Sequence, residues 1–182
     1  MFFNFYKGGF SMEFQSCFDI IGPIMVGPSS SHTAGAVSIG RFIHELLGGT
    51  PEMAKITFYN SFAQTYQGHG TDKAILGGIL GLSTDDTGIK YAIKMAEQAK
   101  FNYTFKLETG DCPYFDHPNT TVIMAKRKQK RAIVGGASLG GGLSKIFKIN
   151  NHDVNIRLST GDNFPLLASK YKSYVIKGKD GK

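Results

Sequence analysis

Cysteine is scarce in this sequence. The two cysteines, Cys17 and Cys112, are far apart and form no CxxC or similar ligand pair. A zinc or iron–sulfur site usually takes three or four ligands of this kind, so the two thiols alone cannot hold one. We therefore expect no metal bound by this chain itself, and no disulfide, since a reducing compartment disfavours one.

Long apolar runs are also lacking. No stretch approaches the roughly 18–20 residues that a membrane helix needs. The first eleven residues, MFFNFYKGGFS, lack the order of charged, aliphatic and small residues found in a secretory signal. We expect a cytoplasmic protein without a membrane partner, in which residues 1–17 are an extension and Met12 is an alternative start.

Acidic residues are fewer than basic ones, and the net charge is +7. Basic residues gather at 126–131 (KRKQKR) and after Lys170, and such patches attract phosphate backbones. However, KRKQKR lies between two β-like runs and is typical of a solvated hairpin turn. No RNA-binding aromatic motif or recognition helix accompanies it, so we expect no nucleic-acid partner.

Several catalytic motifs are absent. The sequence has no GxSxG elbow, no Walker loop and no GxGxxG after a strand. The glycines of GGASLGGG (135–142) lead into β-like sequence, without the helix that would bind a phosphate. Ser31 and His32 are adjacent, which places them poorly as the nucleophile and base of a hydrolase.

Residues 21–40, IGPIMVGPSSSHTAGAVSIG, combine a Gly-Pro turn, hydroxyl side chains, one histidine and a small-residue helix start. The hydroxyls and His32 lie where a helix has unpaired N–H groups and a partial positive charge, which suits a small anion. In the alternative interpretation, one serine caps the helix and His32 is an incidental surface residue. The residues alone do not decide between the two.

A second helix start follows in residues 69–82, HGTDKAILGGILGL. Thr71 or Asp72 would begin this helix, and His69 precedes it much as His32 precedes the first. We expect the two helix starts to converge on one pocket. In the alternative interpretation, Asp72 only caps its helix and His69 is exposed to solvent. The glycines at 77, 78 and 81 are unfavourable within a helix and predict close packing against a neighbouring backbone.

The remaining pattern predicts an α+β fold with a mixed sheet, in which helices dominate early and hairpins late. Residues 101–108, FNYTFKLE, alternate strictly and predict a half-buried strand. Expected helices are 33–47, 71–82 and 84–98, with a short one within 160–168; expected strands are 17–25, 55–60, 101–108, 120–127, 131–138, 143–149, 154–158 and 172–177, and 61–68 is a polar bend.

GPSSSHT followed by a glycine-rich helix resembles the beta chain of the iron–sulfur-dependent L-serine dehydratases. The likeness continues through GHGTDKAILGGILGL, HPNTTVI and GGASLGGG and covers residues 18–168. It implies a two-layer α/β sandwich similar to the allosteric substrate-binding domain of 3-phosphoglycerate dehydrogenase. Residues 169–182 are then a tail or the beginning of a truncated ACT domain.

The resemblance also implies an activity: conversion of L-serine to pyruvate and ammonia without pyridoxal phosphate. In that family a [4Fe-4S] cluster is held by an alpha subunit. This chain would then be the beta subunit, which binds no cluster and is inactive alone. Two copies of this chain could also form a homodimer. The alternative is a regulatory domain that senses serine or a phosphate metabolite. A catalytic half depends on its partner, whereas a sensor binds its ligand alone.

The same resemblance places His32 toward the cluster-bearing partner, and we expect it to assist proton transfer from the substrate. The other candidates share hydroxyl, imidazole, amide or carboxylate groups near the same loops, and we expect them to bind substrate: Ser29, Ser30, Ser31, Thr33, His69, His117, Asn60 and Asp72. His44, in mid-helix, and His152, in a hairpin turn, are expected to be structural or exposed.

Overall fold

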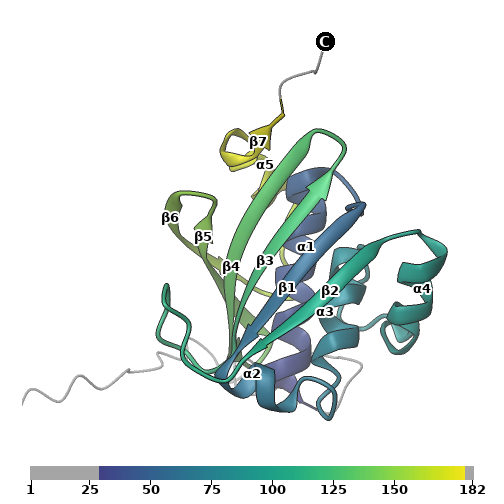
Figure 1. Ribbon diagram of the computed structural model, residues 1–182, viewed down its shortest axis with the longest axis vertical. Coiled ribbons are helices and arrows are strands. Elements are labelled where there is room, and N and C mark those ends of the chain that lie inside the picture. The colour runs from purple at the N-terminus through teal and green to yellow at the C-terminus, as the bar shows by residue number, and fades with distance from the viewer. Residues whose placement is uncertain (1–28, 179–182) are drawn as a thin grey trace, which may run out of the picture.

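The computed structural model describes residues 29–178, and its centre is a mixed β-sheet (Figure 1). Six strands lie in the order β2-β1-β3-β4-β5-β6, and a short seventh strand pairs with β4. Only β1 and β2 are parallel among these pairs. The strands are β1 (Met53–Tyr59), β2 (Asn102–Glu108), β3 (Thr120–Arg127), β4 (Lys130–Gly140), β5 (Leu143–Ile149), β6 (His152–Leu158) and β7 (Ile176–Lys177).

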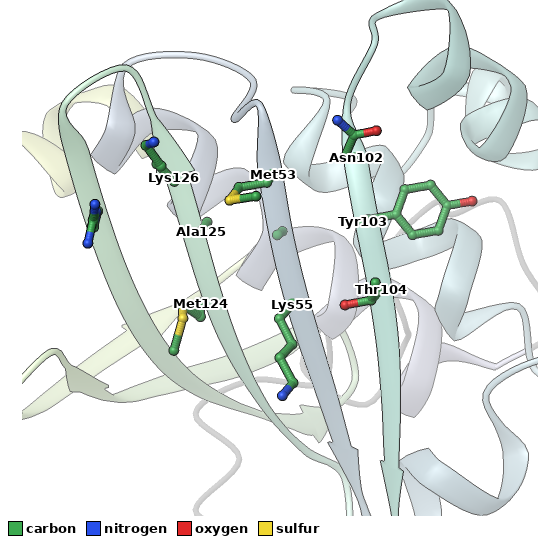
Figure 2. A pocket seen from close by; sticks show the side chains of 10 residues that line it. Met53, Lys55, Asn102, Tyr103, Thr104, Met124, Ala125 and Lys126 are labelled. Atoms are coloured by element: carbon green, nitrogen blue, oxygen red, sulfur yellow. The ribbon is translucent and has the colours of Figure 1, made fainter.

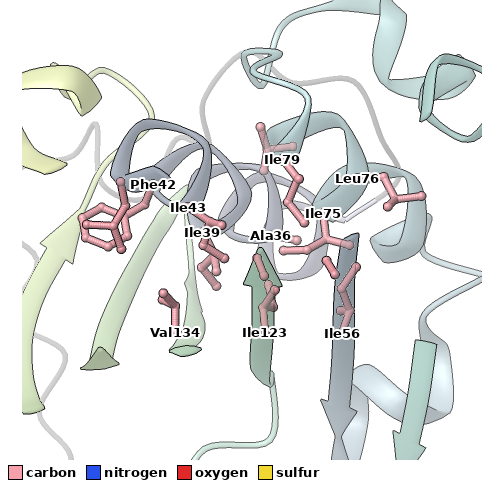
Figure 3. Packing of buried hydrophobic residues seen from close by; sticks show 14 of the residues in the cluster. Ala36, Ile39, Phe42, Ile43, Ile56, Ile75, Leu76, Ile79, Ile123 and Val134 are labelled. Carbon is pink, nitrogen blue, oxygen red and sulfur yellow. The ribbon is translucent and has the colours of Figure 1, made fainter. Parts of the chain in front are cut away.

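Helices cover one face of this sheet, and Figure 3 shows α1 and α3 lying over the strands. The expected α+β class with a mixed sheet is therefore confirmed. The helical segments are a π-helical turn (Ser30–Ala34), α1 (Gly35–Leu47), α2 (Asn60–Thr65), α3 (Thr71–Ile79), a 3₁₀ turn (Thr87–Tyr91), α4 (Ala92–Gln98), α5 (Phe164–Ser169) and a 3₁₀ turn (Lys172–Tyr174).

The apolar stripes expected from the sequence form the core. Ile39, Phe42 and Ile43 of α1 are completely buried, as are Ile75 and Ile79 of α3. Figure 3 shows Ile39 and Ile75 facing the side chains of the central strands. Burial of a large apolar side chain contributes about 1.5–3 kcal/mol, so this layer is the main source of stability. The strand residues in it include Ile56, Ile123 and Val134.

Helices α1 and α3 touch backbone to backbone. A Cβ atom added at Gly78 would lie 2.2 Å from the Val37 carbonyl oxygen, and one at Gly40 would lie 2.6 Å from the Ile75 carbonyl oxygen. Only glycine fits at these two positions, which confirms the expected backbone contact for Gly78. The nearest atoms at Gly77 and Gly81 belong to the side chains of Ile89 and His44. His44 adds a cross-helix hydrogen bond, since its Nδ1 lies 2.9 Å from the Ile79 carbonyl oxygen. Its expected structural role is confirmed.

The helix expected over 84–98 is wrong in its first half. Residues 84–86 form a turn, a 3₁₀ turn follows, and the α-helix begins only at Ala92. The Asp86 carboxylate accepts a hydrogen bond of 2.7 Å from the Gly88 backbone N–H. This local bond competes with helix formation, and Gly88 has a low helix propensity.

The polar bend expected over 61–68 is also wrong, because its beginning is the short helix α2. Asn60 has a φ of +46° and redirects the chain out of β1. Phe62 and Ala63 are then buried, so tertiary packing stabilises a helix too short to show periodicity.

The two late hairpins are confirmed. The basic segment forms the turn between β3 and β4, where Lys128 has a φ of +53°. β5 and β6 form the second hairpin. The short helix expected within 160–168 is α5, which extends one residue further, to Ser169. The strand expected over 172–177 is mostly wrong: a 3₁₀ turn occupies its first half, and only Ile176 and Lys177 pair with β4. The strand expected at 17–25 lies outside the described residues.

No helix within residues 29–178 is both long and apolar enough to cross a membrane.

The α1–α3 contact predicts unequal effects of two glycine substitutions in α3. Gly78→Ala should lower the free energy of unfolding by about 2 kcal/mol or more, because its Cβ would force two backbones apart. Gly77→Ala is the matched control, since the atom nearest to its Cβ would be Cγ1 of the Ile89 side chain, at 3.2 Å, and the substitution gains helix propensity. Urea denaturation of both variants measures the difference. Equal stabilities would contradict a backbone contact that only glycine permits.

Candidate active site at the starts of α1 and α3

The chain enters α1 through a π-helical turn, a feature often found at functional sites. Ser29 is extended, and its carbonyl oxygen accepts hydrogen bonds from the backbone N–H groups of His32 and Thr33, at 3.3 and 2.7 Å. Its hydroxyl makes no capping bond and instead lies 3.0 Å from His32 Nδ1. His32 is only 8% exposed. The interpretation of a capping serine beside a surface histidine is therefore wrong.

A second serine meets the other side of the His32 ring. His32 Nε2 lies 3.2 Å from the Ser61 hydroxyl, which belongs to the first turn of α2. Each ring nitrogen therefore has a serine hydroxyl at hydrogen-bonding distance. A neutral imidazole has one N–H and one lone pair, and a hydroxyl can complement either. The Phe62 ring covers the imidazole, with ring centroids 5.4 Å apart.

The two helix starts converge, as the sequence predicts. The His32 and His69 rings meet edge to face, with centroids 4.5 Å apart. The Thr33 hydroxyl donates a 3.2 Å hydrogen bond to the His69 carbonyl oxygen and joins the two segments. Because α1 and α3 already touch through glycines, the residues before their first turns are held side by side.

Burial and neighbouring charge favour a neutral His32. Burial lowers the pKa of His32 below its usual value, and the adjacent His69 lowers it further. At neutral pH the ring therefore keeps a lone pair that can accept a proton.

Asp72 lies in the first turn of α3 and is buried. Burial raises the pKa of Asp72, while the Lys73 backbone N–H, 2.8 Å from its Oδ1, opposes that shift. Gly70, not Asp72 or Thr71, occupies the N-cap position, and no side chain caps this helix. The expected capping role is wrong, although the helix begins where expected.

A second group of contacts is made by the loop 109–119. It includes His117 of the loop and Asn60, the first residue of α2. The Asn60 amide donates a 2.6 Å hydrogen bond to Asp111, and His117 Nδ1 accepts one of 3.2 Å from the Asn119 backbone. Burial lowers the pKa of His117, opposed by Asp116. The loop reaches the first group at Phe62, whose backbone N–H donates to the Pro118 carbonyl oxygen at 3.4 Å.

Ser61 is the residue of this site that the sequence did not indicate. Its only signal was the apolar pair Phe62 and Ala63 after a polar strand end, which is too short to identify a helix. The side chains of Ser30 and Ser31 lie outside the described part of the structure. His152 is exposed and stacks on Tyr174, with centroids 4.1 Å apart, as expected for a residue outside the site.

The residues described do not fit an iron–sulfur cluster. In 29–178, no three His, Cys, Asp or Glu side chains are close enough together to hold a metal ion. Cys112 is a free and buried thiol, and burial raises its pKa, which disfavours the thiolate that would bind a metal. Cys17 lies outside the described residues.

A hollow of about 460 Å³ lies on the sheet face that α1 and α3 leave uncovered (Figure 2). Figure 2 shows Met53, Lys55 and Met124 along the strands at this hollow. Its lining contains no histidine, carboxylate or cysteine, so it offers no group that exchanges a proton near neutral pH. The full lining is Met53, Ala54, Lys55, Asn102, Tyr103, Thr104, Met124, Ala125, Lys126 and Arg131. The His32 cluster is therefore the better candidate for catalysis.

Comparison with known proteins assigns the chain to a family. The family model described as "Serine dehydratase beta chain" matches residues 16–143, which include the His32 cluster and its loop. The chain belongs to this family. It is 46% identical over 145 residues to the "Probable L-serine dehydratase, beta chain" of Bacillus subtilis, and 41% identical over 147 residues to the "L-serine dehydratase, beta chain" of Peptoniphilus asaccharolyticus.

These alignments cover 80% of this chain in both cases, but only 64% and 65% of the two relatives. The chain thus spans somewhat less than two thirds of their length. It is also 30% identical over 138 residues to the "L-serine dehydratase" of Helicobacter pylori, where the match covers 65% of this chain and 30% of that relative. In that relative, the family region is therefore part of a much longer chain.

The lowered pKa of His32 predicts a pH dependence of stability. The unfolded state, with a histidine pKa near 6.5, binds the proton more readily than the folded state. The free energy of unfolding should therefore fall as the pH is lowered through about 6.5, by at most about 1.4 kcal/mol per pH unit for this group. His32→Gln should reduce the slope between pH 7 and 5, measured by urea titrations. An unchanged slope in His32→Gln would contradict a buried neutral ring.

Proposed function

We propose that this chain is the beta subunit of an L-serine dehydratase and completes an active site with an alpha subunit that holds a [4Fe-4S] cluster. Family membership supports this, as do the printed names of the relatives from Bacillus subtilis and Peptoniphilus asaccharolyticus. The chain matches only 30% of the Helicobacter pylori enzyme. This small share supports a second catalytic part of the enzyme, separate from the region that this chain matches.

The observation that carries the catalytic role is the buried His32, held between two serine hydroxyls and beside His69. Conversion of L-serine to pyruvate and ammonia requires loss of the Cα proton and of the β-hydroxyl group. A base with a lone pair at neutral pH is needed for the first of these losses. We assign this base to a ring nitrogen of His32, because burial keeps the ring neutral.

The neighbouring groups suit an amino-acid substrate. We assign the segment from Ser29 to Thr33, including Ser30 and Ser31, to the substrate carboxylate, and His69, Asp72, Asn60 and His117 to the surrounding wall. His69 Nδ1 and Thr71 Oγ1 are buried and have no hydrogen-bond partner in the described part of the chain. Polar atoms left in this condition cost about 1–3 kcal/mol each, which favours a site completed by another molecule.

We also propose a two-layer sandwich of the type seen in the allosteric substrate-binding domain of 3-phosphoglycerate dehydrogenase. The support is the mixed sheet with helices α1 and α3 on one face and a hollow on the other. We place the domain at residues 18–168. Val175 is nevertheless buried in the same core, so the segment after 168 is packed against this domain.

The test is anaerobic co-expression with the cognate alpha chain and an assay of pyruvate formed from L-serine. His32→Gln should lower kcat about a hundredfold or more, because it removes the base, while subunit association and iron content stay at wild-type levels. His152→Gln should retain full activity. Full activity of His32→Gln would place the base elsewhere.

The chain alone should form no pyruvate. If the isolated chain binds L-serine in calorimetry while its His32→Gln variant is fully active in the complex, the regulatory role is correct and the catalytic one is wrong.

A further inference from the structure

Ser61 has a contact that its local position does not explain. It lies in the first turn of α2, yet it is not the N-cap residue, and no side chain caps this helix. Its hydroxyl instead lies 3.2 Å from Nε2 of His32, which is 29 positions earlier in the chain. A long-range contact of this kind joins two parts of the site.

The backbone of Ser61 is held on both sides. Its carbonyl oxygen accepts a 2.7 Å hydrogen bond from the Thr65 hydroxyl, which closes the single turn of α2. The next residue, Phe62, is completely buried, and its ring packs edge to face on Phe58, with centroids 5.8 Å apart. The Ser61 hydroxyl therefore projects from a fixed backbone toward the imidazole.

The two serines constrain the ring together. Ser29 meets Nδ1 at 3.0 Å, and Ser61 meets Nε2 at 3.2 Å, from segments on opposite sides of the ring. A rotation of the ring about its bond to Cβ moves both nitrogens away from the hydroxyls. Because the ring supplies one N–H and one lone pair, one hydroxyl must accept while the other donates.

We propose that Ser61 is a positioning residue that holds the His32 imidazole, through Nε2, in one orientation. It acts through His32 and not on the substrate. Its importance for turnover rests on the proposed function, whereas its effect on the ring does not.

The experiment separates these two claims. Nitrogen NMR of the histidine rings in the full chain reports the hydrogen bonding of each ring nitrogen of His32, with His32→Gln assigning its signals. Ser61→Ala should shift the Nε2 signal of His32 more than the Nδ1 signal, and Ser61→Thr, which keeps the hydroxyl, should restore the wild-type spectrum. Ser83→Ala is the control, because the hydroxyl of this half-buried serine donates to Asp85 and makes no described contact with His32.

The same variants are then assayed with the alpha chain for pyruvate from L-serine. Ser61→Ala should lower kcat at least tenfold with a smaller change in KM, and Ser61→Thr should recover most of that loss. Unchanged ring signals in Ser61→Ala would overturn the proposal, whether or not activity falls. Changed ring signals with full activity would support the contact between Ser61 and His32 and would count against His32 as the base.

Discussion

The arrangement of the site depends on the direct backbone contact between α1 and α3. Gly40 and Gly78 leave no room for a Cβ atom at this contact, so the backbones of the two helices touch directly. Side chains at both positions would separate the helices and their first turns. The contact therefore sets the distance between His32 and His69, although neither glycine belongs to the site.

Three segments of the chain meet at the starts of α1 and α3, and each contributes a different kind of contact. The π-helical turn brings His32 inward with Ser29 beside it. The turn after β1 supplies Ser61 and the covering ring of Phe62. The loop 109–119 is joined to α2 through the carbonyl of Pro118. The result is a buried imidazole whose ring nitrogens both meet hydroxyl groups. Burial lowers the pKa of His32 and favours the neutral form, in which a histidine can accept a proton.

The sequence predicted those parts of the fold that follow regular patterns. The stripe that includes Ile39 and Phe42 identified α1, and the internal glycines correctly indicated a close contact. Convergence of His32 and His69 followed from two similar helix starts. The sequence pattern gave wrong helix boundaries where local hydrogen bonds or tertiary packing determine the structure. The Asp86 carboxylate accepts a hydrogen bond from the Gly88 backbone, and α4 begins later than expected. Burial of Phe62 stabilises α2, a helix of only six residues. Ser61 was missed for the second reason, since its partner is distant in sequence.

The chain covers less than two thirds of the Bacillus subtilis and Peptoniphilus asaccharolyticus relatives, and it lacks a cluster of metal ligands within 29–178. The most direct measurement is a structure of the anaerobic complex with the alpha chain and bound L-serine. The account predicts a ring nitrogen of His32 about 3–3.5 Å from the substrate Cα. A side chain of the alpha subunit in that position, with His32 turned away, would contradict it.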